Sequence, residues 1–204
     1  MSRLCGAWAL SGKPAALLLP EEAKQAMRAF LGMAPEDCGE FARGPLWILA
    51  PRRNMAQREG RCIAFEGCVA FEEEAQDLEW LLREQDPETE IRIRPNGQYA
   101  LLYGDAQRNK LFLLRDPSGG ERLYYLQLGE LLLFSTSLKA LLAHPNVERS
   151  IHPGAAAECL INGQVLFGRQ SLFAGVCEVP PGCAAAVYGG AVAVRPHWDL
   201  LEKP

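Results

Sequence analysis

The sequence predicts an α+β fold in which helices cover the faces of a largely antiparallel sheet. Three observations favour this class. Apolar runs at 98–103 and 110–115 flank a polar loop, as is typical of a β-hairpin. Runs at 123–125 and 131–134 repeat that pattern. Segments with helical spacing of apolar residues occur in groups. Because hairpins join antiparallel strands, we expect the sheet to be mainly antiparallel.

The composition suits a single domain, or one domain with a tail. The chain has 204 residues, of which 49% are apolar and 23% charged, so it can bury a substantial core. A net charge of −4, with no basic cluster denser than Arg52-Arg53, argues against nucleic-acid binding. No apolar run reaches the roughly 20 residues that span a bilayer, and no signal peptide is apparent. We therefore expect a cytoplasmic protein that does not enter a membrane.

Seven cysteines and three histidines are present, and neither set has the spacing of a metal site. The cysteines form an odd number and contain no C-x-x-C pair. In a reducing compartment such cysteines are expected to be free thiols. We expect no metal and no other cofactor.

Apolar runs and helix signals locate the elements of the amino-terminal half. Cys5 heads the first run, where it is either a small buried hydrophobe or a nucleophile. Pro20 with two following acids marks a helix start, and Gly32 marks its end. In chain order we expect a strand at 4–10, a helix at 20–31, a loop at 32–45, strands at 46–49 and 61–66, the second ended or bent by Gly67, and a helix at 72–84.

Turn and capping residues locate the elements of the carboxyl-terminal half. Gly163 closes the last helix, and the glycine pair at 189–190 suits a tight hairpin. Arg115 and Asp116 precede a strong turn signal, which we expect them to hold through hydrogen bonds. In chain order we expect a strand at 91–94, a turn at 95–97, strands at 98–103, 110–115, 123–125 and 131–134, helices at 135–143 and 152–162, and strands at 183–188 and 191–195.

Five phrases of the carboxyl-terminal half carry a family resemblance through their order and spacing. They are NGQYALLYGD at 96–105, LRDPSGGERLYY at 114–125, FSTSLKALL at 134–142, SLFAGV at 171–176 followed by VPPG at 179–182, and WDL at 198–200. With them the chain resembles the amino-terminal glutaminase domain of asparagine synthetases. The amino-terminal half is similar more loosely, mainly at Cys5-Gly6 and Glu66-Gly67.

The resemblance implies a four-layer αββα sandwich of two mainly antiparallel sheets, of the amino-terminal-nucleophile hydrolase type. The glutamine-amidotransferase-like domain would cover residues 1–195, with 196–204 as an exit tail or the start of a linker. The implied partner is an ATP-using synthetase domain or chain. No Ser-Gly-Gly-x-Asp-Ser nucleotide loop occurs in these residues, so a separate chain would supply that half, or this chain is an excised domain.

The resemblance also implies a chemistry, in which a cysteine thiolate attacks the side-chain amide of glutamine and releases ammonia. The nucleophile corresponds to Cys5, which four residues precede, so its nitrogen is not a free amine without processing. The Asn-Gly oxyanion hole of the family corresponds to Glu66-Gly67. The acid that holds the substrate's amine corresponds to Asn96, which precedes Gly97. Replacing an oxyanion donor costs about 10²–10³-fold in rate in a comparable enzyme.

The family's arginine for the glutamine carboxylate has no counterpart at the matching stretch. That stretch falls at 44–48, where the sequence is GPLWI. Arg43, Arg52 or Arg53 would have to reach the substrate by a different route.

These departures lead to two hypotheses. In the first, the glutaminase site is degenerate and the domain is a scaffold or partner module of an asparagine-synthetase-like, ATP-dependent amide-forming system. In the second, the domain is an active glutaminase once processing exposes Cys5. A third hypothesis, a small-molecule sensor that uses the former pocket, has no support in the sequence.

Overall fold

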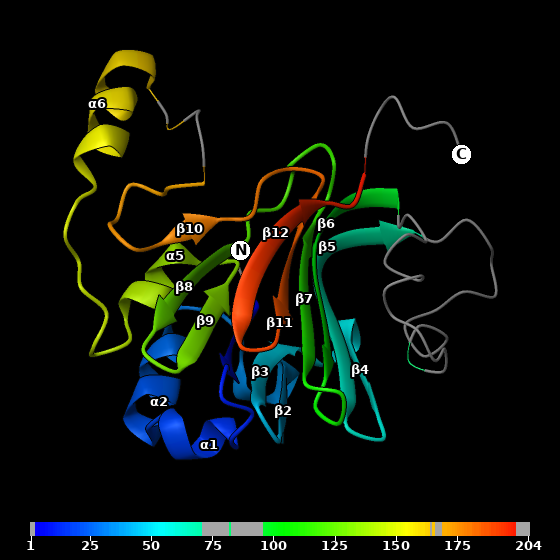
Figure 1. The fold of residues 1–204 in the computed structure, drawn as a ribbon. Coiled ribbons are helices and arrows are strands. Elements are labelled where there is room, and N and C mark those ends of the chain that lie inside the picture. The colour runs from blue at the N-terminus through cyan, green and yellow to red at the C-terminus, as the bar shows by residue number, and fades with distance from the viewer. Residues whose placement is uncertain (1–2, 71–81, 83–95, 164, 166–168, 199–204) are drawn as a thin grey trace.

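Two stacked six-stranded sheets form the centre of the computed structural model (Figure 1), which describes residues 3–70, 82, 96–163, 165 and 169–198. Sheet A has the strand order β10-β8-β9-β1-β3-β2, and sheet B has the order β12-β11-β7-β6-β5-β4. Every strand pairing is antiparallel, as the hairpin patterns predict.

Most of the strands coincide with the predicted apolar runs. Sheet A consists of β1 (Cys5–Ala9), β2 (Cys38–Arg43), β3 (Leu46–Pro51), β8 (Tyr124–Leu128), β9 (Leu131–Ser135) and β10 (Cys177–Glu178). Sheet B consists of β4 (Met55–Arg58), β5 (Arg61–Ala70), β6 (Asn96–Asp105), β7 (Lys110–Arg115), β11 (Cys183–Tyr188) and β12 (Ala191–Pro196).

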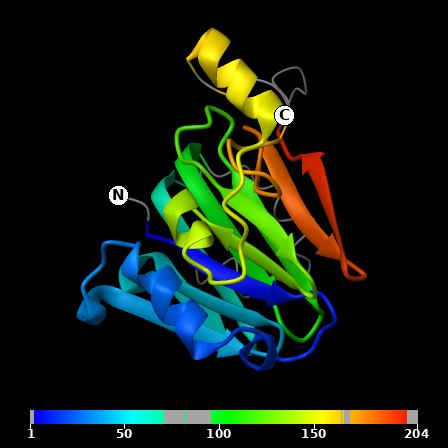
Figure 2. The same cartoon turned by 90° about the vertical axis from the view of Figure 1, so that its left-hand side faces the viewer.

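Three short helices cover the outer face of sheet A, as Figure 2 shows from that side. They are α1 (Ala15–Leu18), α2 (Glu21–Ala29) and α5 (Leu138–Leu142). The Ser137 side chain caps α5 by accepting from the amide of Ala140, which satisfies one of its free N–H groups. A fourth helix, α6 (Pro153–Asn162), stands away from the sheets and ends at Gly163 in the left-handed conformation, as predicted.

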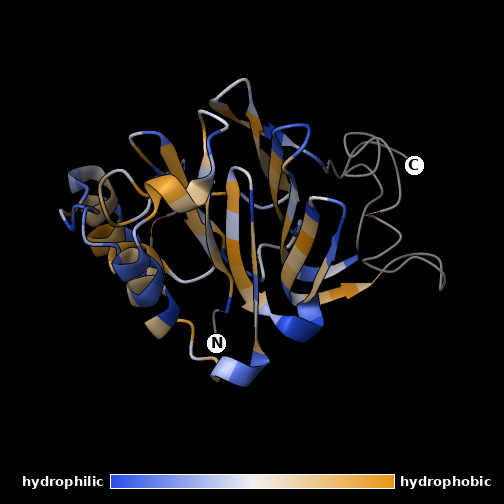
Figure 3. Ribbon diagram, turned by 90° about the horizontal axis from the view of Figure 1, so that it is seen from below, coloured by the Kyte–Doolittle hydropathy of each residue, from blue (hydrophilic) through white to orange (hydrophobic). Residues whose placement is uncertain are grey.

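The apolar side chains form three clusters, one between the sheets and one on each outer face. The first includes Leu4, Trp8 and Ile48 and lies between the sheets. The second joins sheet A to its helices, and the third, which includes Leu82, lies on the outer face of sheet B. Figure 3 shows the apolar residues concentrated along the strands. The fold is therefore the α+β sandwich of two antiparallel sheets that the resemblance implies.

Several local predictions need correction. Strand β2 lies in the segment predicted as a loop. Its residues alternate between buried and exposed over only a short stretch, and Gly39 interrupts the alternation. Helix α1 and strands β4 and β10 were also not predicted, because they span only four, four and two residues. The predicted helix at 72–84, apart from Leu82, and the strand at 91–94 lie outside the described residues.

The structure also decides two points about glycines. Of the two alternatives for Gly67, ending or bending the strand, the first is wrong, because β5 continues to Ala70 in register with β6. Asn96 and Gly97 belong to β6 rather than to a turn, and Gly97 pairs with Val69. Both glycines therefore mark a local distortion of the β5–β6 ladder and not the end of a strand.

Candidate functional site

The Cys5 side chain faces the helices and not the space between the sheets. Cys5 heads β1 and pairs with Leu49 on one side and Ser135 on the other. Its side chain is fully buried in the cluster that contains Met27 of α2, whereas its neighbour Leu4 belongs to the cluster between the sheets. Because successive strand residues point to opposite faces, the two side chains lie on opposite sides of sheet A.

Burial suppresses the nucleophilic form of this thiol. Removal from solvent, with a smaller contribution from nearby Cys38, raises the pKa of Cys5 far above its ordinary value. Since the thiolate is the attacking species, burial and a raised pKa both disfavour attack by this thiol in the conformation described. In this conformation Cys5 fits its structural interpretation, a small hydrophobe packed at the start of a strand.

The backbone just before Cys5 is held firmly by the end of β9. The amide of Leu4 donates to the Thr136 hydroxyl at 3.2 Å. The carbonyl of Leu4 accepts from the Ser135 hydroxyl at 2.7 Å and from the amide of Thr136 at 3.0 Å. Residue 4 therefore continues the line of β1, and its apolar side chain is fully buried between the sheets.

Glu66 binds this preceding segment and makes no hydrogen bond to Cys5. It lies on β5 and is 7% exposed. Its carboxylate accepts from the amide of Arg3 at 2.7 Å and from the hydroxyl of Thr136. The residue at the family's oxyanion position thus contacts the chain itself.

Gly67 and Gly97 are required by the backbone of the β5–β6 pair. Their φ angles are 95° and 122°. An added Cβ would lie 2.1 Å from the carbonyl oxygen of Gln98 at position 67 and 2.2 Å from that of Cys68 at position 97. Because carbon and oxygen atoms cannot approach so closely, only glycine fits at either position.

Asn96 is not brought to Glu66. In the β5–β6 ladder Glu66 is opposite Ala100, while Asn96 is opposite Ala70 at the strand end and is exposed. Four residues of strand correspond to roughly 13 Å. Of the four positions matched to the family's substrate contacts, Glu66 is therefore buried and hydrogen-bonded, and Asn96 is exposed. Gly67 and Gly97 are required by the backbone of the β5–β6 pair.

Glu121 joins the site although the sequence did not single it out. Its Cγ lies 2.9 Å from the place where a Cβ on Gly67 would stand. Burial, and next the negative charge of Glu66, raises the pKa of Glu121. The only sequence signal was its place in the turn phrase after Asp116, so the acidic pair is visible only in three dimensions.

The turn that carries Glu121 is fixed by two buried charged residues. Asp116 accepts from the amides of Tyr99, Gly120 and Glu121 and from the Ser118 hydroxyl. Burial opposes ionisation of Asp116, but these hydrogen bonds outweigh it and lower the pKa.

Arg115 completes the same turn. Its guanidinium donates to the carbonyls of Glu121, Val179 and Gly119 at 2.7–2.9 Å, and it pairs with Glu178 at 2.7 Å. The prediction that Arg115 and Asp116 hold this turn through hydrogen bonds is confirmed.

The three candidate arginines lie at different ends of β3. Arg43 pairs with Leu46, at the end of β3 far from Cys5. Arg52 and Arg53 form the short helix η2 (Arg52–Asn54) directly after β3, at the end where Cys5 lies. They line a hollow together with Arg3.

The described residues contain no group of three or more His, Cys, Asp or Glu side chains that would hold a metal ion. The seven cysteines are free thiols. Among the helices of the described part, none has the length and apolar character needed to cross a membrane.

Stacked antiparallel sheets, with β1 in the middle of one of them, define an amino-terminal-nucleophile hydrolase fold of the class II glutamine amidotransferase type. A family model for the glutamine amidotransferase domain matches residues 76–198. The chain belongs to this family.

Comparison with known proteins agrees at the level of family and fold. Asparagine synthetase (glutamine-hydrolyzing) 3 of Bacillus subtilis is 28% identical over 108 residues, covering 53% of this chain and 18% of the relative. Asparagine synthetase (glutamine-hydrolyzing) 2 of the same organism is 34% identical over 56 residues, or 28% of this chain and 8% of the relative. The chain thus aligns with less than a fifth of these relatives.

The fold itself matches solved structures over almost its whole length. Glutamine phosphoribosylpyrophosphate amidotransferase from B. subtilis superposes with a TM-score of 0.55 at 12% identity, covering 96% of this chain and 49% of that one. A second structure, described as the allosteric regulatory enzyme of purine biosynthesis, gives a TM-score of 0.56 at the same identity and coverage.

Proposed function

We propose that this domain is a glutamine-amidotransferase-like scaffold that does not hydrolyse glutamine. The observation that carries the proposal is the position of Cys5: its thiol is buried beneath the helices, on the face of sheet A opposite Glu66. A nucleophile must instead be exposed in a pocket beside its base and its oxyanion donors.

The groups that would assist Cys5 argue in the same direction. The nitrogen of Cys5 is an amide within β1, so it is not the free amine that such enzymes use as a base. Glu66 offers only acceptor oxygens where an oxyanion needs donors, and an ionised carboxylate would repel the developing charge. The acidic pair of Glu66 and Glu121 makes this region still less suited to an oxyanion.

The partner that we propose is an ATP-using synthetase domain or chain within an amide-forming system. The curated relatives are glutamine-hydrolysing asparagine synthetases, of which this chain covers a small part. At the far end of the domain, the amides of His197 and Trp198 donate to the carbonyl of Gly182 at 2.9 and 3.2 Å, so both residues are still held by the domain. We propose that the domain ends at or after Trp198, slightly beyond residue 195, and that a cytoplasmic setting keeps its thiols reduced.

The first experiment measures ammonia release from glutamine by the intact chain and by Cys5→Ala. We expect the two proteins to give the same background rate, and intact mass to retain the residues before Cys5. A glutaminase rate that disappears in Cys5→Ala would overturn the scaffold proposal.

The second experiment tests the alternative, an active glutaminase that forms after processing. A chain that begins at Cys5, released by cleavage of a fusion protein, gives that residue a free amine. We expect no activity, because the thiol still faces the helices and Glu66 still replaces an oxyanion donor. Cys5-dependent turnover by this form alone would establish the alternative.

A further inference from the structure

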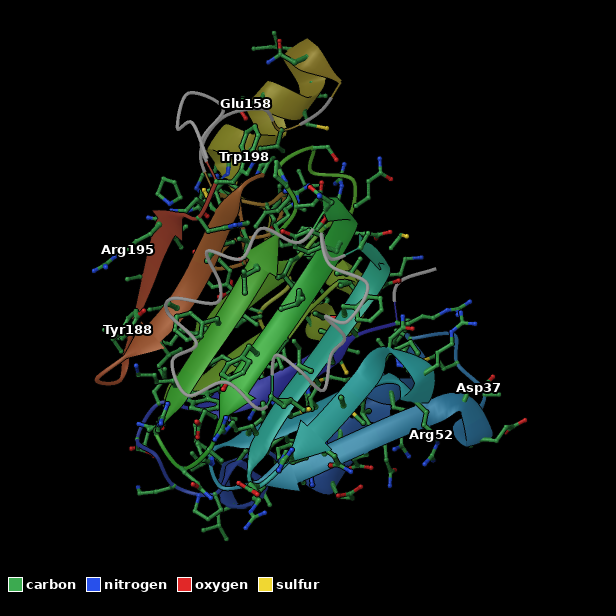
Figure 4. All side chains as sticks on the ribbon, turned by 90° about the vertical axis from the view of Figure 1, so that its right-hand side faces the viewer. Asp37, Arg52, Glu158, Tyr188, Arg195 and Trp198 are labelled. Atoms are coloured by element: carbon green, nitrogen blue, oxygen red, sulfur yellow. The ribbon has the colours of Figure 1, made fainter. Side chains whose placement is uncertain are left out.

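Strand β12 forms one edge of sheet B. It pairs with β11 over its whole length, and it is the last strand in the order of that sheet. Figure 4 shows it at the margin of the described structure, with the Arg195 side chain labelled beside it. An edge strand offers its outward N–H and C=O groups to any further strand that reaches it.

The β11–β12 turn determines which backbone groups of β12 point outward. Two glycines, with φ of 55° and 82°, connect the strands, as in a two-residue type I′ turn. The residues that close such a turn are hydrogen-bonded to each other, and bonded and non-bonded pairs then alternate along the ladder. The amide of His197, which donates to the carbonyl of Gly182 at 2.9 Å, fits this alternation.

Val192 and Val194 are therefore the residues of β12 that direct their N–H and C=O groups away from β11. Within the part of the chain that the structure describes, no other strand or loop forms a backbone hydrogen bond with them. The next outward position is Pro196, which has no N–H and ends the series of donors.

The other edge strands of the two described sheets are protected against pairing in ways that β12 is not. Strand β10 has only two residues, β2 carries the charged side chain of Glu40, and β4 ends in Arg58. Short length and charged side chains are the usual protection of sheet edges. Residues 191–194 of β12 alternate between alanine and valine, so the first charge on this strand is that of Arg195.

We propose that β12 pairs with β12 of a second copy of this chain, antiparallel and about a two-fold axis. One register satisfies every outward group of both valines, because it joins Val192 of each copy to Val194 of the other. In this register Ala193 lies opposite Ala193 of the other copy. Sheet B then continues from one copy into the next.

The charges of the two copies are compatible in this register. Arg195 lies opposite the uncharged Ala191 of the other copy, so no like charges meet across the interface. The Arg195 guanidinium is also directed toward β11, where it lies 5.9 Å from the centre of the Tyr188 ring, and Figure 4 labels both residues.

The apolar side chains also fit a second copy. Val192 and Val194 pack against the core between the sheets but remain half-buried, so pairing removes more of their surface from water. On the outer face only the small side chain of Ala193 meets its own copy at the axis. A second copy thus supplies an edge of matching length without an opposing charge.

This inference goes beyond the proposed scaffold function and does not depend on it. Neither Cys5 nor Glu66 lies on β11 or β12. A failure to dimerise would leave the glutaminase experiments unaffected, and glutaminase activity would leave the pairing of β12 unaffected.

Sedimentation equilibrium of the intact chain at concentrations up to about 1 mM tests the association. We expect a reversible equilibrium between monomer and dimer, because backbone hydrogen bonds and a narrow apolar strip join the copies. A chain that remains monomeric at every concentration would overturn the proposal.

Two charge variants should change the association in opposite directions. Ala193→Lys places like charges opposite each other at the axis and should weaken it by at least about tenfold. Ala191→Glu faces Arg195 of the other copy and should strengthen it by about threefold. Gln57→Lys and Gln57→Glu are the matched controls on the edge strand β4, where Gln57 is exposed, and neither should change the association.

Cross-linking tests the register directly. Opposed residues of a non-hydrogen-bonded pair have Cα atoms about 4.5 Å apart, which is within disulfide range. With oxidised glutathione, Ala193→Cys in a Cys68→Ala background should form a disulfide between copies as the oxidant is reduced to two glutathione thiols. The control Gln57→Cys in the same background should not.

Two further results would contradict the proposal. One is a dimer that Ala193→Lys weakens no more than Gln57→Lys does, because the interface would then lie elsewhere. The other is cross-linking of Gln57→Cys as readily as of Ala193→Cys. Melting curves of each variant exclude loss of folding as the cause.

Discussion

The carboxylate of Glu66 accepts a hydrogen bond from the hydroxyl of Thr136, and this contact joins the two sheets. Glu66 lies on β5 of sheet B, and Thr136 directly follows β9 of sheet A. Thr136 also accepts from the amide of Leu4, while Glu66 accepts from the amide of Arg3. Together the two side chains fix the start of β1 between the sheets.

We predict that Thr136→Val destabilises the domain by about 1–3 kcal/mol, because the buried Glu66 carboxylate loses a donor that water does not replace. The free energy of unfolding in urea measures the effect. Valine keeps the shape of threonine, so packing changes little.

A double-mutant cycle with Glu66→Gln provides the control. If the hydrogen bond between Thr136 and Glu66 stabilises the domain, Thr136→Val should lower the free energy of unfolding by clearly less in the Glu66→Gln background than in the unmodified chain. Equal costs in both backgrounds would mean that Thr136 acts only through Leu4.

We predict that alkylation separates the cysteines by exposure and not by their position in the family motif. Iodoacetamide should label exposed Cys68 and leave Cys5 unlabelled in the folded chain, because Cys5 is fully buried and its pKa is raised by that burial. Peptide mass mapping before and after denaturation measures both sites. Rapid labelling of Cys5 at neutral pH would show that the site opens in solution.

The sequence predicts the paired strands of this fold well because each has a continuous apolar run. The hairpins β6–β7, β8–β9 and β11–β12 occur where predicted, and all of these strands except β12 contain buried apolar residues. The missed strands lack such a run: β10 has two residues, β4 is partly exposed, and β2 is interrupted by Gly39. Their pairing depends on distant strands that local sequence does not specify.

The site is less predictable than the fold because it depends on which face of a strand a residue occupies. The motif identifies Cys5 and Glu66 as site residues. Leu4 and Cys5 point to opposite faces of sheet A, however, and it is Leu4 that lies on the face toward Glu66. The role of Glu121 depends on a turn that brings it to Gly67. Neither relation is written in the local spacing of residues.

We predict that Gly67→Ala lowers the free energy of unfolding by more than the cost of placing an alanine in the left-handed backbone conformation. The added Cβ would stand 2.1 Å from a carbonyl oxygen, so the β5–β6 ladder must shift. The control is Gly129→Ala in the β8–β9 turn, where φ is 59° and no atom lies within 4 Å of the added carbon.

Gly129→Ala should lose about 1–2 kcal/mol, the cost of the left-handed conformation. Gly67→Ala should lose clearly more. Comparison of the two unfolding free energies isolates the clash, and similar losses would contradict the close approach.

We predict that the domain loses stability as the pH falls below about 6.5, through His144, which is buried, and His197, which is half-buried. Burial lowers the pKa of His144 and of His197 in the folded state. Below the ordinary value of 6.5 the unfolded chain binds protons that the folded chain does not, so protonation favours unfolding. Each histidine contributes at most about 1.4 kcal/mol per pH unit in this window.

The carboxyl groups contribute differently to the same curve. The raised pKa of Glu121 acts in the opposite sense, because the folded state binds that proton first. The lowered pKa of Asp116 costs stability only below its ordinary value of 3.8. A loss of unfolding free energy between pH 7.5 and about 5.5 is therefore assigned to the histidines, because any titration of Glu121 in this range opposes it. A His144→Gln, His197→Gln variant should have a flatter curve over this range, and an unchanged slope would assign the pH dependence to other groups.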